Sequence, residues 1–323
     1  MNVVVTGGAG FIGSHLVDRL LADGHAVTVL DNLSTGRAAN LAAHLGHPRL
    51  RFLRGSILDA TLVDAVMSGT DVVYHLAAAV GVGHVVKDPL WTAVTNAHGT
   101  EIVLEHARAR GARVVFASTS EIYGTSDALP YREDGPRVLG PTWIHRWSYS
   151  TAKALGEHLC FAHAERGLAV SIVRYFNTYG PRMDPAGYGS VVARFVSQAL
   201  DGAPLTVHGD GAQARCFTFV SETVDATVRA GTLDAAIGQV FNVGSPFHST
   251  IGDLARLIIE LTGSGSTVTH IDHAAVYGEG FADTRTRVPD VSKIAARLGW
   301  QPTIPLREGL ARVIAERRAS EAR

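Results

Sequence analysis

A glycine-rich loop near the start of the chain constrains the fold more than any other feature. The loop, Thr6–Gly13, lies between an apolar segment that predicts a strand, Asn2–Thr6, and a segment with helical apolar spacing, Phe11–Asp23. A strand, a glycine turn and a helix in this order present unpaired backbone N–H groups and the positive end of a helix dipole to an anion. The residues expected to contact a pyrophosphate there are Gly7, Gly10, Phe11, Ile12 and Gly13.

The second predicted strand, Ala26–Asp31, ends in a carboxylate where a bound dinucleotide places its adenosine ribose. Because a carboxylate accepts hydrogen bonds from ribose hydroxyls and repels a 2′-phosphate, Asp31 favours NAD over NADP. Arg37 follows shortly after this strand and could in principle accommodate a phosphate, so NADP stays open as the alternative cofactor.

Short apolar segments alternate with helical ones through the first half of the chain, which is typical of a parallel α/β sheet with right-handed crossovers. Val114–Ala117 is continuously apolar, as expected of a strand that is buried on both faces. Further strands are expected at Arg51–Leu53, Asp71–Leu76, Arg113–Ala117 and Val170–Tyr175, and helices at Thr92–Arg110 and over the residues that end at Gly167.

The pattern changes beyond Asn177, where glycines, prolines and short strands alternate with helices. Such a mixture predicts a smaller α+β lobe. The residues after about Ala315 are charged, and we expect the chain to fray there. The strands of the lobe are expected at Leu205–Val207 and Val268–Ile271, and its helices at Val191–Leu200 and Ile251–Leu261.

These patterns divide the chain into a dinucleotide-binding domain over residues 1–176 and a second domain over residues 177–323. We expect the two to be interleaved, because Val240–Val243 reads as a short apolar strand that can join the first sheet. Residues 215–245 would then return to the first domain.

Composition argues against several classes of function. The formal net charge of −1 gives no broad basic field for a nucleic acid or a membrane surface, and no apolar run reaches the ~18 residues of a membrane span. Cys160 and Cys216 are too few for a disulfide framework or a cysteine-rich zinc site, and the histidines show no metal-ligand spacing. We expect a cytoplasmic protein without a bound metal.

Tyr149 and Lys153 lie four residues apart in a helical segment, so their side chains share a face. The ammonium can then lie near the phenol, and a nearby positive charge favours the phenolate. An oxidised nicotinamide would add a second positive charge. The pair is therefore expected to act as a base near neutral pH, with Tyr149 as the proton acceptor.

The glycine loop followed by Tyr149 and Lys153 resembles the extended short-chain dehydrogenase/reductases, a family of NAD-dependent nucleotide-sugar epimerases, dehydratases and decarboxylases. The resemblance covers nearly the whole chain, from Val3 to Leu310. It implies an α/β fold with a Rossmann-type doubly wound parallel sheet and a smaller α+β substrate-binding lobe. It also implies that NAD is the cofactor and a UDP-sugar the substrate.

The resemblance implies a homodimer as well, because related enzymes pair two helices across a two-fold axis. The helices that correspond here are Thr92–Arg110 and the one that carries Tyr149. Both are expected to expose apolar surface, from Val94, Ile102, Val103 and Leu104 on the first and from Leu155, Leu159 and Phe161 on the second.

The resemblance gives roles to side chains around the end of the fifth strand. Thr119 would hydrogen-bond the sugar hydroxyl that Tyr149 deprotonates, supported by Lys153, while hydride passes from C4 to the nicotinamide. Asn96 matches an asparagine beside the active site, and Ser56 stands where relatives place an aspartate next to the adenine. The further cofactor contacts implied are Asn32, Ser56, Ile57, Leu76, Ala77, Ala78 and Asn96.

Two segments resemble those that hold the sugar nucleotide in this family. Arg174–Arg182 supplies Asn177, and Pro204–Phe217 supplies Arg215 to the phosphates. A guanidinium suits a diphosphate because its planar fork donates two parallel hydrogen bonds. Arg194 lies where carboxylate-binding epimerases can place an arginine. The substrate contacts implied are Thr119, Tyr149, Asn177, Arg194, Thr206, Val207, Arg215 and Arg287.

Oxidation at C4 leaves several reactions open. A 4,6-dehydratase of this family would carry an aspartate before Glu121, where this chain has Ser120. Thr119–Glu121 and Arg146–Tyr149 resemble elements of the UDP-glucuronate decarboxylases and the UDP-apiose/xylose synthases. Tyr277–Asp290 resembles a further segment of that group.

UDP-glucuronate decarboxylation is therefore the expected reaction, with Arg287 beside the carboxylate and with Ser120 and Glu121 shaping the loss of CO2. The alternative is a 4-epimerase acting on UDP-glucuronate and UDP-galacturonate or on UDP-glucose and UDP-galactose. A non-catalytic NAD sensor is disfavoured, because it needs no tyrosine–lysine pair.

Overall fold

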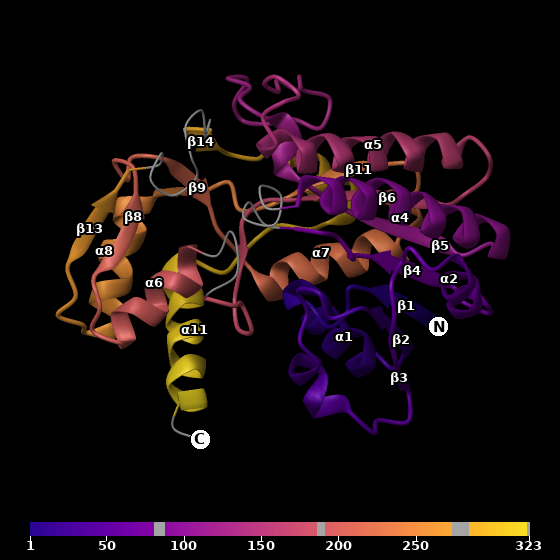
Figure 1. Cartoon of the computed structure of the whole chain (residues 1–323), viewed down its shortest axis with the longest axis horizontal. Helices are drawn as coiled ribbons and strands as arrows, with labels where there is room; N and C mark the ends of the chain where they lie inside the picture. The colour runs from indigo at the N-terminus through magenta and orange to yellow at the C-terminus, as the bar shows by residue number, and fades with distance from the viewer. Residues whose placement is uncertain (81–87, 186–190, 273–283, 322–323) are drawn as a thin grey trace.

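The computed structural model describes residues 1–80, 88–185, 191–272 and 284–321. Within them, a seven-stranded parallel sheet has the order β11-β6-β5-β4-β1-β2-β3 (Figure 1). The predicted Rossmann-type sheet is confirmed. Its strands are β1 Asn2–Thr6, β2 Ala26–Asp31, β3 Leu50–Arg54, β4 Val72–His75, β5 Arg113–Thr119, β6 Val170–Tyr175 and β11 Val240–Val243.

Helices cover both faces of the sheet, so its strands are apolar on both sides. Val3 and Val5 belong to the core that includes α1 and α7, whereas Val4 packs in the core that includes α2, α4 and α5. This alternation follows from the two-residue period of a strand. The helices are α1 Phe11–Ala22 and α7 Val220–Thr232 on one face, and α2 Ala60–Met67, α4 Pro89–Arg110 and α5 Arg146–Ala164 on the other.

A second group of elements lies to the left of the sheet in Figure 1, where β8 and β13 run side by side next to α8. It contains α6 Val191–Leu200, β8 Leu205–His208, α8 Ile251–Thr262, β13 Val268–Ile271 and α11 Leu306–Glu321. Short strands lie between the two groups: β7 Thr178–Tyr179, β9 Ala214–Cys216, β10 Thr218–Phe219, β12 His248–Thr250 and β14 Thr286–Arg287. The remaining elements are helix α10 Ser292–Leu298 and three 3₁₀ turns: η1 Ala38–His44 after β2, η2 Ser120–Tyr123 after β5 and η3 Asp234–Ala236 after α7.

The chain returns to the main sheet after it has entered the second group. β11 pairs in parallel with β6, with Val240 opposite Ile172 and Val243 opposite Tyr175. The predicted return of Val240–Val243 to the first sheet is thus confirmed, while the domain boundaries themselves stay a prediction.

The structure corrects two expectations about helices. The chain does not fray after Ala315, because α11 continues to Glu321 and the Arg318 guanidinium donates a 2.8 Å hydrogen bond to the Thr262 carbonyl. α4 begins at Pro89, before the predicted Thr92, because the Asp88 carboxylate caps its first turn by accepting from the Trp91 N–H at 2.9 Å.

The expected apolar surface of α4 is also smaller than the sequence suggested. Ile102, Val103 and Leu104 are buried in the core of their own chain and cannot serve as contact surface for a partner. Val94 on α4, with Leu155 and Phe161 on α5, is partly exposed, so only these three keep the predicted role.

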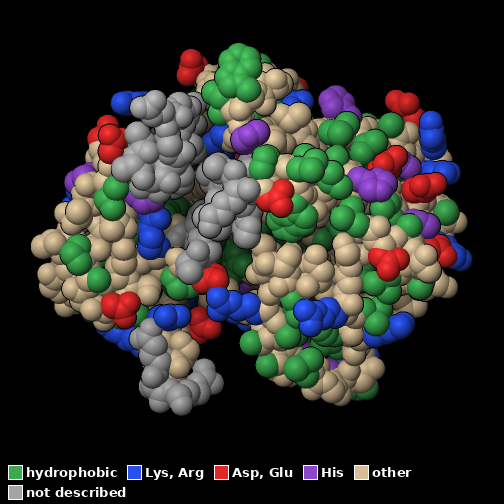
Figure 2. All heavy atoms as spheres, in the orientation of Figure 1, with side chains coloured by type: hydrophobic (Ala, Val, Ile, Leu, Met, Phe, Trp, Pro, Cys, Tyr) green, Lys and Arg blue, Asp and Glu red, His purple; other side chains and the backbone are tan. Residues whose placement is uncertain are grey.

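Acidic and basic side chains are mixed over the face shown in Figure 2 and do not gather by sign. Across the described residues, no helix is both long and apolar enough to cross a membrane. The same residues contain no cluster of three potential metal ligands.

Candidate functional site

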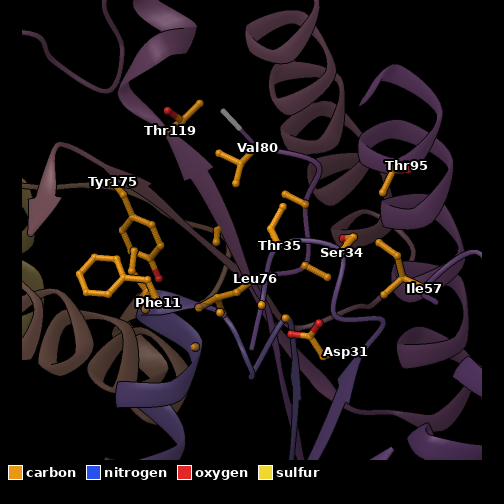
Figure 3. Close-up of a pocket in the computed structure, with 18 of the residues that line it drawn as sticks. Phe11, Asp31, Ser34, Thr35, Ile57, Leu76, Val80, Thr95, Thr119 and Tyr175 are labelled. Atoms are coloured by element: carbon orange, nitrogen blue, oxygen red, sulfur yellow. The ribbon is translucent and has the colours of Figure 1, made fainter. Parts of the chain in front are cut away.

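A cavity of about 620 Å³ opens at the carboxyl ends of β1, β2, β4 and β5, where ligands of open α/β sheets bind. Figure 3 shows Asp31, Ser34 and Thr35 on one side of it and Thr119 and Tyr175 farther along. Thirteen of the predicted cofactor residues line it: Gly7, Gly10, Phe11, Ile12, Gly13, Asp31, Asn32, Ile57, Leu76, Ala77, Ala78, Tyr149 and Lys153.

The glycines keep open a cradle that side chains would fill. Gly7 has a φ of +72°, and a Cβ there would lie 2.7 Å from the Ala77 nitrogen. A Cβ on Gly13 would lie 2.2 Å from the Gly7 carbonyl oxygen. Gly10 precedes α1 without a capping side chain, so the first N–H groups of the helix are left for a ligand. These features fit the pyrophosphate of NAD.

Asp31 lies at the end of β2, where the sequence placed it. Its Oδ2 accepts a hydrogen bond from the Ala9 N–H at 2.9 Å, and its Oδ1 accepts one from the Leu33 N–H at 2.8 Å. Burial raises the pKa of the carboxyl, and the two N–H donors oppose that rise. The backbone thus fixes the orientation of this carboxylate inside the cavity.

Two predicted cofactor residues, Ser56 and Asn96, do not line the cavity. The Ser56 hydroxyl accepts a hydrogen bond from the Leu58 N–H at 3.2 Å, and Ile57 forms the wall instead. The Asn96 amide accepts from the Ala79 N–H and donates to the Ala79 carbonyl, both at 2.9 Å. Asn96 therefore positions the segment after β4, which agrees with the supporting role expected of it.

Thr119, Tyr149 and Lys153 all line the same cavity, from the end of β5 and from α5. The Lys153 ammonium donates a 2.8 Å hydrogen bond to the Ala117 carbonyl and lies 4.8 Å from the centre of the Phe116 ring. Burial lowers the pKa of Lys153 to about 8, although the negative charge of Glu157 opposes this. The ammonium is thus poised to lose its proton not far above neutral pH.

The phenol of Tyr149 is held neutral by its surroundings. Burial raises its pKa, and the charge of Glu121 raises it further, while a hydrogen bond with Thr119 lowers it. The pKa of Tyr149 is thus raised overall, and its predicted role as a base, which relies on Lys153 together with the positive charge of an oxidised nicotinamide, stays a prediction. Proton removal by Tyr149 needs an additional positive charge nearby.

Glu121 lies beside Tyr149 in a group of arginines from three other elements. Its Oε2 accepts a 2.9 Å hydrogen bond from Arg146 Nη1 on α5, and its Oε1 lies 3.7 Å from Arg287 Nη1 on β14. Burial would raise the pKa of Glu121, but Arg146, Arg287 and Arg215 together hold it below its usual value. The carboxylate is therefore charged at neutral pH.

Arg215 and Arg287 reach this place on neighbouring strands. β9 and β14 pair in parallel with Arg215 opposite Arg287, and both side chains are buried. We call Glu121, Arg146, Arg215 and Arg287 the arginine cluster. The sequence predicted roles for three of its members and none for Arg146, although Arg146 lies three residues before Tyr149 and so on the same helical face.

A buried ion pair involves Glu157, one helical turn after Lys153, and Arg174 on β6. The Glu157 carboxylate accepts hydrogen bonds from Arg174 Nε at 2.9 Å and Nη2 at 2.7 Å, and from the Ser118 hydroxyl at 2.5 Å. Arg174 also donates to the Tyr123 hydroxyl at 2.8 Å, which donates to Asn242 Oδ1 at 2.7 Å. The pair joins α5 to β5 and β6.

The other predicted substrate residues contact protein in the second group of elements. Asn177 Nδ2 donates to the Cys216 carbonyl at 3.3 Å, and Arg194 Nη2 donates to the Thr206 carbonyl at 3.3 Å. Val207 is fully buried in the core, where its side chain contacts protein. Only Thr119 and Tyr149 of the predicted substrate residues line the cavity, and the substrate contacts of the others stay a prediction. The others are Asn177, Arg194, Thr206, Val207, Arg215 and Arg287.

Part of one predicted segment cannot be compared with the structure. Within Tyr277–Asp290, residues 277–283 lie outside the described residues, and Arg287 is described. The cavity also has wall residues that the sequence did not single out, among them Val80, Thr95, Tyr175, Thr178, Met183 and Asp184.

Comparison with known proteins gives consistent matches along the chain. A model described as the NAD dependent epimerase/dehydratase family matches residues 3–244. The chain is 40% identical over 312 residues to a UDP-N-acetyl-alpha-D-glucosaminuronate decarboxylase of Bacillus cytotoxicus, covering 96% of each. It is 37% identical over 317 residues to UDP-glucuronic acid decarboxylase 1 of Xenopus tropicalis, covering 97% of this chain and 71% of that one.

A solved structure shares the fold over almost the whole length. The UDP-glucose 4-epimerase of Thermus thermophilus, in complex with NAD, matches with a TM-score of 0.87 and 31% identity. The match covers 99% of this chain and 100% of that one.

Proposed function

This chain belongs to the NAD-dependent epimerase/dehydratase family, and we propose that it decarboxylates a UDP-linked uronic acid. The observation that carries the proposal is the arginine cluster beside Tyr149. Three guanidinium groups surround one carboxylate there, at a place where Glu121 contacts both Arg146 and Arg287. Such an excess of positive charge suits a substrate that brings its own carboxylate.

NAD, when bound in the glycine cradle, would take up a hydride from C4 of the sugar and return it to C4 after CO2 has left, so that the cofactor ends in its starting state. Tyr149 accepts the proton of the C4 hydroxyl, and Thr119, which hydrogen-bonds Tyr149, orients that hydroxyl. Lys153 supplies a positive charge on the same wall of the cavity. The ketone formed at C4 lies β to the carboxylate carried by C5, so the bond between C5 and the carboxylate carbon can break, with its electron pair moving into the C4 enolate as CO2 leaves. C5 then takes up a proton, and the C4 ketone is reduced back to the alcohol by the returning hydride.

The charged groups then decide what becomes of the carboxylate. Arg287 orients it, and Glu121 with Ser120 shapes the side of the site from which CO2 leaves. A guanidinium that gripped the carboxylate firmly would oppose the charge delocalisation needed for CO2 loss. That arrangement would instead favour 4-epimerisation, which is the second candidate because the matching NAD-bound structure is a 4-epimerase.

Product mass separates the two reactions. The protein would be incubated with UDP-glucuronate, and separately with UDP-N-acetylglucosaminuronate, in the presence of catalytic NAD. Loss of the mass of one CO2 supports the proposal and shows which uronate is the substrate. An unchanged mass with inverted C4 would establish the epimerase, and turnover of UDP-glucose alone would remove the carboxylate argument.

Two substitutions test the arginine cluster. Glu121→Gln and Arg287→Ala should each lower the decarboxylation rate by at least about tenfold, because each removes a charge next to the reacting carboxylate. Arg285→Ala is the matched control: it lies two residues from Arg287 with a side chain that is 87% exposed. Near-normal rates in both cluster variants would favour the epimerase.

We propose that the protein assembles as a homodimer through α4 and α5. Val94 is 42% exposed, Leu155 45% and Phe161 38%, and Leu90 at the start of α4 is 73% exposed. Isolated apolar residues on a surface are common, but here they gather on two helices that pack against each other. The four would be covered by the same helices of a second copy.

Light scattering at micromolar concentration tests this assembly. The parent chain should be dimeric, and Phe161→Glu should dissociate it, because a charge would be buried at the interface. Phe247→Glu is the control, since Phe247 is 79% exposed on a loop after β11. A monomeric parent chain would refute the homodimer.

A further inference from the structure

An ion pair spans the mouth of the cofactor cavity at its adenosine end. Arg37 Nη2 lies 2.5 Å from Asp184 Oδ2, and both residues line the cavity together with Asp31. Arg37 comes from the loop after β2, and Asp184 comes from the segment after β7. Two parts of the chain far apart in sequence therefore meet over the place where Asp31 marks the ribose.

The backbone fixes Arg37 next to Asp31. The Arg37 N–H donates to the Ala9 carbonyl at 3.0 Å, and the Ala9 N–H donates to Asp31 Oδ2 at 2.9 Å. A Cβ on Gly36 would lie 3.0 Å from that same oxygen. An arginine at this position after the second strand is the kind of residue that accommodates the 2′-phosphate of NADP. The 2′-phosphate of NADP would therefore have to pair with the guanidinium of Arg37.

The segment that carries Asp184 is tied down on the side of α1. Arg182 Nη2 lies 2.6 Å from Asp18 Oδ2, and the His15 ring nitrogen Nε2 lies 3.0 Å from the Pro181 carbonyl oxygen. Asp18 and His15 both belong to α1, the helix that begins at the glycine loop. Asp184 is thus placed over the cavity by anchors that do not depend on Arg37.

We propose that Asp184 is a specificity-determining residue that excludes NADP by holding the guanidinium of Arg37. With Arg37 paired to Asp184, a 2′-phosphate would face the carboxylates of both Asp31 and Asp184. It would have to displace Asp184 before it could bind the guanidinium of Arg37. The pair is 63% and 37% exposed, so its attraction is screened and adds little to folding stability. The expected effect of the Arg37–Asp184 ion pair is on the choice between NAD and NADP, which differ by one phosphate.

The inference rests on the adenosine end of the cavity and not on the decarboxylation proposed above. Cofactor binding alone tests the role of Asp184, so a negative result would leave the proposed decarboxylation untouched, and the reverse also holds. Calorimetry would measure the affinities of NAD and NADP for the parent protein and for Asp184→Asn. We expect the ratio of the NADP to the NAD dissociation constant to fall by at least about fivefold, because Arg37 is released while one repelling charge is lost.

A second substitution identifies Arg37 as the residue released. In the double variant Arg37→Gln/Asp184→Asn, most of the gained NADP affinity should disappear. Glu260→Gln is the control, because it removes one negative charge from an exposed ion pair with Arg307 on α11, outside the cavity. Its cofactor ratio should equal that of the parent.

Three results with these variants would overturn the proposal, and a fourth comes from Asp31→Asn. Asp184→Asn could leave the cofactor ratio unchanged, the double variant could keep the full gain, or Glu260→Gln could produce the same gain through net charge alone. Asp31→Asn separates the two carboxylates. If Asp184 acts through Arg37, the two single substitutions should lower the ratio by factors that multiply in the double variant Asp31→Asn/Asp184→Asn. A double variant no better than Asp31→Asn alone would also count against Asp184.

Discussion

The glycine-loop side of the cavity is built mainly from backbone groups, whereas the arginine cluster next to Tyr149, whose members do not line the cavity, is built from charged side chains. The first uses the glycine loop and the N-terminus of α1, within one continuous strand–helix–strand unit. The second uses the arginine cluster, whose members come from η2, α5, β9 and β14. A pyrophosphate can be held by any chain that folds this unit, but the arginine cluster exists only when the whole molecule is folded.

The signs of the charges differ as well. The glycine-loop side carries the carboxylates of Asp31 and Asp184 together with the guanidinium of Arg37, whereas the arginine cluster holds three guanidinium groups around the single carboxylate of Glu121. Tyr149 lines the cavity and lies next to Glu121, whose charge raises its pKa, so this residue stands at the boundary between the two regions.

The largest effect is expected at that boundary. Tyr149→Phe should lower turnover by about 10²–10⁴-fold, because the hydroxyl that accepts the substrate proton is gone. NAD affinity should change little, since the backbone cradle is intact. Single-turnover assays and calorimetry on the same sample would measure the two quantities.

Tyr74→Phe provides the control for this substitution. Tyr74 is fully buried on β4 and does not line the cavity. Its turnover should stay near that of the parent. Normal turnover in Tyr149→Phe would contradict the proposal that Tyr149 accepts the substrate proton while the glycine cradle only binds the cofactor.

The next largest effect is expected at the buried ion pair between Glu157 and Arg174. Glu157→Leu should lower the free energy of unfolding by about 3–5 kcal/mol, because the guanidinium of Arg174 would stay buried without its carboxylate. The double variant Glu157→Leu/Arg174→Met should recover much of the loss, since it buries no charge. Urea denaturation would measure both.

The result also tells whether the pair serves more than stability. A double variant that regains stability but not turnover would show that Glu157 and Arg174 hold Thr119 and Lys153 in place. A single variant as stable as the parent would contradict the buried pairing.

The smallest expected effect comes from the titration of Lys153. As pH rises, its loss of a proton should lower the activity, whereas its contribution to stability should increase. Burial lowers the pKa of Lys153 from 10.5 to about 8. If catalysis needs the ammonium, kcat/KM should fall as pH rises through about 8.

Stability should follow the other sign. Between about 8 and 10.5 the unfolded chain binds more protons at this residue than the folded chain does, so Lys153 raises the free energy of unfolding as pH increases. Rate profiles and urea denaturation over this range would measure the two trends. A flat rate profile through pH 8 would show that the charge of Lys153 is not used.

The features predicted correctly from the sequence are those set by local periodicity. The bounds of β1, β2, β6 and α6 agree with the structure, because a short continuous apolar run, the helical period and the flanking glycines are all local. Tyr149 and Lys153 line one cavity wall for the same reason, since four residues make about one helical turn.

The expectations that were wrong depended on packing. The burial of Ile102, Val103 and Leu104 is decided by the sheet face that α4 covers, and the helical end at Glu321 is decided by contacts of α11 with α8. Neither can be read from apolar content or charge along one segment, because the same residues suit a partner surface or a core equally well.

The amino-acid sequence by itself determined the sheet, the glycine cradle, the carboxylate of Asp31 and the tyrosine–lysine pair. Only the tertiary structure decided that Arg146 joins Glu121, that Arg215 lies opposite Arg287, and that Asp184 meets Arg37. The physical reason is the range of the interactions. Backbone hydrogen bonds and side-chain periods act within a few residues, whereas these charges meet only after crossovers and lobe packing close long loops of chain.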